Sequence, residues 1–185
     1  MNRQKIIVCI TGGPSSGKSG TAHSLTGYLK DCGVFAEISQ EEFKNWVLEK
    51  RPFHPGDQSY VFEVQAKKER HLMASGVGAI VTDSPLMLGI LYGRLNDPYE
   101  REFKVCELLL KKHHKIAKDH GYKVEHYFMI RRENDFEDEG RIHDLKQAKV
   151  IDSDCLALMN ELGIKYKSVN GASDIIEDLK EKGLI

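Results

Sequence analysis

The segment that most constrains the fold is residues 12–19, which read GGPSSGKS and match the pattern G-x-x-x-x-G-K-[S/T] at every position. It follows the apolar, β-branched run Lys5–Thr11 and opens a stretch, residues 18–29, that only Gly20 and Gly27 interrupt. A strand, a glycine-rich turn and a helix in this order form a loop whose backbone N–H groups surround a phosphate. The pattern therefore predicts a phosphate-binding loop (P-loop).

Strand-like and helix-like segments alternate along the rest of the chain. Further strands are predicted over residues 34–38, 79–82, 123–130 and 164–169, and helices over 40–49, 57–74, 99–118 and 173–182. One more helix carries the apolar residues Val150, Ile151, Leu156 and Met159. Such alternation predicts βαβ crossovers with parallel strands. We expect a three-layer α/β fold of the P-loop NTPase type, with a five-stranded parallel sheet and helices on both faces, in one domain spanning residues 1–185.

The most polar stretch, RRENDFEDEGRIHD, follows the fourth predicted strand and precedes a helix. Its charge indicates a loop rather than a packed element. We expect it to form a lid over about residues 131–145.

Composition narrows the function classes without naming one. The 185 residues include 27 Lys and Arg against 28 Asp and Glu, for a formal net charge of -1. Proteins that bind duplex DNA usually carry a basic excess, so DNA is not the favoured partner. The apolar run near the N-terminus is too short for a membrane span or a signal segment, which predicts a cytoplasmic protein. The cysteines form no zinc or redox pair.

The P-loop motif predicts which residues bind the phosphates and the metal ion. The residues expected to hold the phosphates of ATP are Gly12, Gly13, Ser15, Ser16, Gly17, Lys18, Ser19 and Gly20. Lys18 would reach the β- and γ-phosphates, and the Ser19 hydroxyl would bind Mg²⁺. Asp83 ends the third predicted strand at the same sheet edge and is the expected acidic partner for the metal. The structural alternative for Asp83 is a helix N-cap ahead of Ser84.

Phosphoryl transfer needs charge neutralisation and a group that accepts the proton of the attacking hydroxyl. Glu37, Glu41 and Asp83 are the acids expected near the carboxyl ends of the strands, with Glu37 or Asp83 favoured as the base. Glu41 could equally be a first-turn acid of the following helix. Arg141 in the lid is favoured over Arg131 for neutralising charge, and solvated loop arginines are the alternative.

Two glutamines and four histidines could be functional or structural. Gln58 and Gln65 are seven residues apart, hence on one helix face, where their amides could contact a base or a ribose. An ordinary polar helix face is the alternative. The histidines at 113, 114, 120 and 126 include no i, i+4 pair. We expect them at a solvated helix end rather than at a metal.

Motifs beyond the P-loop extend over most of the chain. They are Glu37, Glu41 and Lys44; Asp57, Gln58 and Gln65; the run TDSPL at 82–86; Arg131; Gly140 and Arg141; Ala148; and GIKY at 163–166. With these, the chain resembles small AAA-domain ATP-binding proteins common in bacteriophages, which are related to nicotinamide riboside kinases and nucleotide kinases. The resemblance implies ATP and Mg²⁺ as cofactors, Arg131 among the ATP-binding residues, and an acceptor site that includes Glu41, Lys44, Gln58 and Gln65.

The expected activity is transfer of the γ-phosphate of ATP to a nucleoside, a nucleotide or a related riboside. A phage protein would act in the host cytoplasm. One alternative is a kinase that acts on DNA or on a modified base within it. Another is a switch protein in which ATP binding orders a loop without phosphorylating a small molecule. The acceptor and the oligomeric state stay open at this point.

Overall fold

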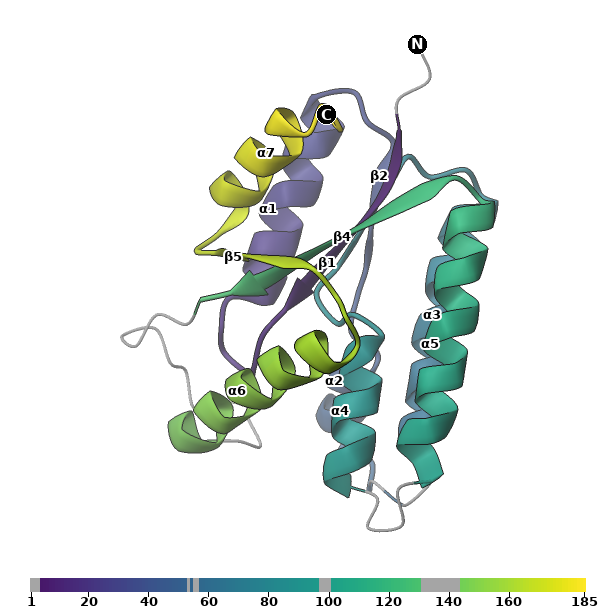
Figure 1. Cartoon of the computed structure of the whole chain (residues 1–185), viewed down its shortest axis with the longest axis vertical. Coiled ribbons are helices and arrows are strands. Elements are labelled where there is room, and N and C mark those ends of the chain that lie inside the picture. The colour runs from purple at the N-terminus through teal and green to yellow at the C-terminus, as the bar shows by residue number, and fades with distance from the viewer. Residues whose placement is uncertain (1–3, 53, 55–56, 97–100, 131–143) are drawn as a thin grey trace.

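The structure, a computed structural model, describes residues 4–52, 54, 57–96, 101–130 and 144–185, which contain five strands and seven helices (Figure 1). The strands are β1 (Lys5–Thr11), β2 (Ala36–Ser39), β3 (Ala79–Thr82), β4 (Tyr122–Met129) and β5 (Tyr166–Val169). The helices are α1 (Lys18–Asp31), α2 (Phe43–Leu48), α3 (Asp57–Ala74), α4 (Met87–Asn96), α5 (Arg101–Asp119), α6 (Leu145–Glu161) and α7 (Ala172–Glu181).

The strands form one sheet in the order β2-β3-β1-β4-β5, and every neighbouring pair is parallel. The predicted five-stranded parallel sheet is therefore confirmed. β1 lies at its centre, between β3 and β4. Because all strands run in one direction, their carboxyl ends share one edge of the sheet, where Thr11, Ser39 and Thr82 close β1, β2 and β3. That edge positions the candidate site.

Helices cover both faces of the sheet, which confirms the three predicted layers. Along β1, alternate residues pack on opposite sides: Ile6, Val8 and Ile10 join the core beneath α1 and α7, whereas Ile7 and Cys9 join the core on the other face. Figure 1 shows α1 and α7 on one side of the sheet and α3 and α5 on the other. Strands covered on both faces have no exposed side, which explains the unbroken apolar run of β1.

The helix α4 is an element that the sequence analysis does not assign. Its sequence, MLGILYGRLN, is apolar on most sides and contains two glycines, so it lacks the one-sided apolar stripe of a surface helix. A Cβ atom added at Gly89 would lie 2.5 Å from Phe62 Cδ2 of α3, and one at Gly93 would lie 3.3 Å from the Phe103 backbone of α5. The glycines therefore let α4 pack closely against its neighbours. None of the helices in the described ranges is long and apolar enough to cross a membrane.

Two strands begin two residues later than predicted, for the same physical reason. Val34 and Ile164 have the β-branched side chains typical of strands, but both belong to the capping turn that follows the preceding helix. The N–H of Val34 donates to the carbonyl of Leu29 at 2.9 Å, and that of Ile164 donates to Met159 at 2.8 Å. Each follows a glycine in the left-handed region, with φ of 71° or 65°. These are helix C-caps of the Schellman type, so β2 and β5 start after them.

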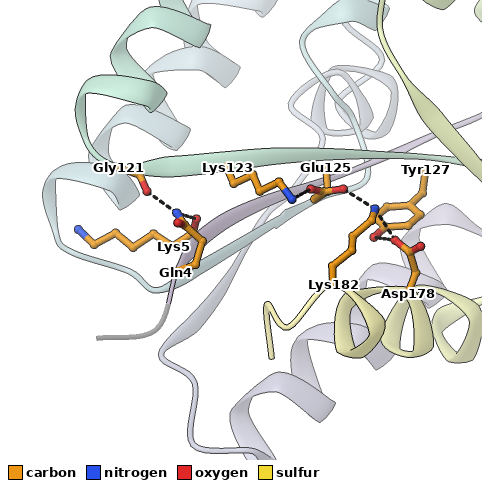
Figure 2. A network of polar contacts seen from close by, with 8 residues as sticks. All are labelled: Gln4, Lys5, Gly121, Lys123, Glu125, Tyr127, Asp178 and Lys182. Atoms are coloured by element: carbon orange, nitrogen blue, oxygen red, sulfur yellow. Dashed lines mark hydrogen bonds and ion pairs between the residues drawn. The ribbon is translucent and has the colours of Figure 1, made fainter. Parts of the chain in front are cut away.

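A polar network fixes α7 to β4 (Figure 2). The hydroxyl of Tyr127 donates to Asp178 Oδ2 at 2.6 Å, and Lys182 Nζ lies 2.6 Å from both Asp178 and Glu125. Lys123 Nζ lies 2.8 Å from the other oxygen of Glu125. Burial acts to raise the pKa of Asp178, but hydrogen bonds from Lys182 and Tyr127 outweigh it and lower that pKa to about 2. The network therefore fixes the C-terminal helix to the sheet, and we assign it a structural role.

Candidate active site

The P-loop connects the end of β1 to the start of α1, as the motif predicts. Gly12 and Gly17 have φ of 152° and 87°, and Ser15 also lies in the left-handed region, with φ of 57°. A Cβ atom on Gly12 would lie 2.8 Å from Ser16 Oγ and 3.4 Å from Met129 Cβ. Both the backbone angle and the available space therefore require glycine at this position. The tight turn exposes backbone N–H groups at the start of α1, where the helix dipole favours an anion.

Hydrogen bonds hold the loop in a closed form. Lys18 Nζ donates to the carbonyl oxygen of Gly13 at 2.7 Å, and Ser16 Oγ donates to the same oxygen at 3.0 Å. The N–H of Gly13 donates to Asp152 Oδ1 of α6 at 2.6 Å. The lysine is thus folded over its own loop, where a bound phosphate would compete with the carbonyl for its ammonium group.

Burial and nearby acids have opposite effects on the pKa of Lys18. Burial lowers the pKa of Lys18 from its usual value, while the carboxylates of Glu41, Asp83 and Asp152 act in the opposite direction. These acids come from three separate parts of the chain: the turn before α2, the end of β3 and the middle of α6. Of the three, the sequence analysis includes Glu41 and Asp83 among its candidates.

Asp83 follows β3 directly and is only 5% exposed. Its Oδ1 atom has no hydrogen-bond partner among the described residues. Burying a carboxylate oxygen without a partner costs free energy, so such an atom indicates a missing cation or donor. Together with the Ser19 hydroxyl it offers the oxygen ligands that Mg²⁺ prefers. The helix-cap alternative for Asp83 is wrong, because α4 begins four residues later, at Met87.

Asp152 of α6 contacts the P-loop, and its charge also acts on Tyr92 of α4; the sequence analysis predicts neither residue. Burial raises the pKa of Tyr92, and the carboxylates of Glu41 and Asp152 raise it further, so these groups act on one another. Cys155 lies one turn after Asp152, and burial raises its pKa to about 12, which keeps it a thiol. Neither Tyr92 nor Asp152 belongs to a recognisable motif. Their positions relative to the P-loop depend on how α4 and α6 pack, which the sequence does not show.

The carboxylate of Glu37 forms an ion pair with Lys30 of α1. Glu37 lies in the middle of the edge strand β2, with its side chain 39% exposed and its Oε1 atom 3.1 Å from Lys30 Nζ of α1. Its carboxylate already has a cationic partner at the side of the sheet. The role of Glu37 as a base stays a prediction, whereas Asp83 and Glu41 are the candidate acids whose charges act on Lys18.

Gln58 and Gln65 share the inner face of α3, at 5% and 4% exposure, which excludes a solvated polar face. Gln65 Nε2 donates to Ser39 Oγ at 2.8 Å, at the end of β2. The Oε1 atom of Gln65 has no hydrogen-bond partner within the described ranges. Lys44 lies in α2, but its side chain is outside the described set, as are Arg131, Arg141 and the whole lid up to residue 143.

The histidines do not all lie at a solvated helix end. His113 is 3% exposed, and its Nε2 atom lies 2.8 Å from Glu69 Oε2 of α3. His114 contacts His126 of β4 edge-on, with ring centroids 6.3 Å apart. No group of three or more His, Cys, Asp or Glu in the described residues is arranged to hold a metal ion. The histidines therefore contribute to the packing of α5 against α3 and the sheet.

A parallel sheet in the order β2-β3-β1-β4-β5 with a glycine-rich loop after its central strand defines the P-loop NTPase fold. Within that class, the chain belongs to the AAA domain family, whose profile matches residues 7–176.

Solved structures of similar fold include the APS kinase CysC of Mycobacterium tuberculosis in complex with AMPPNP and APS. It is 14% identical with a TM-score of 0.50, and the match covers 96% of this chain and 99% of that one. The Cys556Ala mutant of the same kinase is 16% identical with a TM-score of 0.42, over 86% of this chain and 99% of that one. A comparison with curated proteins found no match.

Proposed function

We propose that the protein is an ATP-dependent phosphotransferase that moves the γ-phosphate of ATP to a hydroxyl group of a nucleoside, a nucleotide or a related riboside. The observation that carries this proposal is the buried, partnerless oxygen of Asp83 beside the P-loop lysine. A site that only bound phosphate would not need an acid there. An acid is useful where a metal ion is held or a proton is accepted.

The loop and its lysine act on ATP. Backbone N–H groups of residues 15–19 hold the phosphates, and Lys18 moves from the Gly13 carbonyl to the β- and γ-phosphates. Ser19 and Asp83 would hold Mg²⁺, which when bound neutralises charge on the phosphates. Arg131 and Arg141 from the lid remain part of the proposal as further cationic groups.

The acceptor hydroxyl attacks the γ-phosphorus in line with the leaving group. A new O–P bond forms as the bond between the γ-phosphorus and the β,γ-bridging oxygen breaks, and ADP leaves. The hydroxyl proton passes to a carboxylate, for which Asp83 is the proposed acceptor. Buried surroundings strengthen these charge interactions and keep water from competing as the nucleophile.

The test is a transfer assay with γ-labelled ATP, Mg²⁺ and a panel of nucleosides, nucleoside monophosphates, nicotinamide riboside and DNA oligomers. Lys18→Ala serves as the control, because it removes the cation without touching the acceptor side. Label in a small acceptor, lost in the variant, supports the proposal. Label in DNA alone favours the polymer kinase, and ATP binding without any transfer favours the switch protein.

A further inference from the structure

The backbone of Gly13 is hydrogen-bonded at both of its polar groups. Its carbonyl oxygen accepts from Lys18 Nζ at 2.7 Å and from Ser16 Oγ at 3.0 Å, and both of these bonds lie within the P-loop. Its N–H donates at 2.6 Å to Oδ1 of Asp152, which is 139 residues away in the sequence. This last bond joins the P-loop to a separate element, α6.

The helix α6 holds Asp152 in a defined position. A capping box closes the start of the helix: Asp144 Oδ1 accepts from the N–H of Gln147 at 2.8 Å, and Gln147 Oε1 accepts from the N–H of Asp144 at 2.9 Å. Ile151 and Cys155 are 4% and 0% exposed and belong to the apolar core that α6 shares with α4. Because the helix is capped and packed on both sides of Asp152, this carboxylate is a fixed anchor for the loop.

Binding of ATP changes the carbonyl side of Gly13 and not its N–H side. Lys18 has to leave the Gly13 carbonyl to reach the phosphates. The N–H groups proposed to hold the phosphates begin two residues later, at Ser15, so the N–H of Gly13 stays available to Asp152. Hydrogen bonds to a charged acceptor are roughly twice as strong as neutral ones. The bond to Asp152 can therefore persist while the lysine moves.

We propose that Asp152 is a positioning residue for ATP binding: its hydrogen bond with Gly13 keeps the P-loop in its phosphate-binding form when Lys18 leaves the Gly13 carbonyl. The inference rests on the ATP-binding part of the proposed function and not on transfer to an acceptor. The carboxylate also places a negative charge near a bound triphosphate, which opposes binding. The hydrogen bond and the charge thus act in opposite directions, and substitutions can separate them.

Two variants make this separation. Asp152→Asn keeps an oxygen that can accept the N–H of Gly13 but removes the charge, whereas Asp152→Ala removes both. In isothermal titration with MgATP, we expect the Kd of Asp152→Ala to be at least about fivefold above that of the wild type. The Kd of Asp152→Asn should be equal to that of the wild type or lower. Asp154→Ala is the matched control, because it removes a carboxylate from another side of the same helix and should bind ATP normally.

Two further measurements distinguish positioning of the loop from a general effect on stability. Amide exchange of Gly13, followed by ¹⁵N NMR without nucleotide, should be slow in the wild type and in Asp152→Asn and faster in Asp152→Ala. In the transfer assay, KM for ATP should rise about fivefold in Asp152→Ala with KM for the acceptor unchanged, and Asp152→Asn should restore it. Loss of stability alone would not produce this difference between the two KM values.

Wild-type ATP affinity in Asp152→Ala, or equal weakening in Asp152→Asn and Asp152→Ala, overturns the inference and leaves ATP binding at the P-loop intact. Melting temperatures verify that the variants fold. If Asp152→Ala does not fold, Asp152→Asn decides: a Kd at least about fivefold higher overturns the inference, and an unchanged Kd with slow exchange of Gly13 supports it. A wild-type protein that does not bind MgATP overturns the proposed function itself.

Discussion

Some residues at the candidate site are constrained in ways that other residues of the same type in this chain are not. Gly12 needs both an unusual backbone angle and an empty Cβ position, whereas Gly27 in the middle of α1 has no atom within 4 Å of an added Cβ. Asp83 is buried with an oxygen that no described residue pairs, whereas most of the other acids that the structure describes are exposed or form ion pairs. Requirements of this kind mark positions where function, rather than stability, explains the residue.

Gly12→Ala is expected to weaken ATP binding at least about tenfold, because the new methyl group would meet Ser16 Oγ and distort the turn that aims the N–H groups. Isothermal titration with MgATP measures the change. Gly27→Ala is the matched control and should bind ATP as the wild type does, with a free energy of unfolding higher by up to about 1 kcal/mol. Normal ATP affinity in Gly12→Ala would contradict the described loop geometry.

Asp83→Asn is expected to reduce kcat by about a hundredfold or more while leaving the melting temperature equal or higher. The amide keeps the shape of the side chain but removes a buried charge and the proposed metal ligand and base. Steady-state kinetics and thermal unfolding of the same sample measure both effects. A large fall in the melting temperature with normal kcat would show that Asp83 is a structural residue.

Among the elements, those with a periodic pattern or a motif were predictable. The alternating strands and helices and the P-loop followed from β-branched runs, glycines and helical periodicity, because these signals are local in the sequence. α4 was missed because a helix buried on most sides has no polar face to reveal its period. Tyr92 and Asp152 were missed because their positions depend on α4 and α6 packing together. The ion pair between Glu37 and Lys30 was not predictable, because the sequence does not show that β2 and α1 bring the two side chains together.

Gly89→Ala tests the close packing of α4 on α3. The added methyl group would lie 2.5 Å from Phe62 Cδ2, and overpacking of this kind costs about 1–3 kcal/mol in the free energy of unfolding. Urea unfolding measures the loss. The double variant Gly89→Ala with Phe62→Leu should be less destabilised than the sum of the two single variants. Strict additivity would mean that these two residues do not contact one another.

Across the described part of the molecule, polar groups gather in three regions. The carboxyl edge of the sheet gathers the P-loop, Asp83 and Asp152, whereas the network of Tyr127 and Asp178 fixes α7 to β4. The buried face beneath α5 adds a third set of titratable groups, His113, His114 and His126, that has no part in the proposed chemistry. Burial lowers the pKa of His114 and of His126, which connects the stability of the fold to pH.

Acid is expected to destabilise the protein through His126. Burial lowers the pKa of His126 from 6.5 to about 4, and the neighbouring His114 adds to the shift. Between these values the unfolded chain binds a proton that the folded chain does not. The free energy of unfolding is therefore highest above pH 6.5 and falls as the pH drops towards 4, by at most about 3 kcal/mol.

Urea unfolding at a series of pH values between 4 and 7.5 measures this dependence. His126→Gln should flatten the curve in that window, whereas the exposed His120→Gln should leave it unchanged. An identical pH dependence in the wild type and His126→Gln would exclude His126 as its source.

The most direct test of the central claim follows the fate of the γ-phosphate by ³¹P NMR during incubation of the protein with MgATP and a mixture of nucleosides and nucleotides. The account predicts that the γ-phosphate signal of ATP declines as an equal amount of a new phosphate ester and of ADP appears, and that Lys18→Ala abolishes all three changes. ATP that is bound but left intact, or hydrolysed only to inorganic phosphate, would contradict a phosphotransferase.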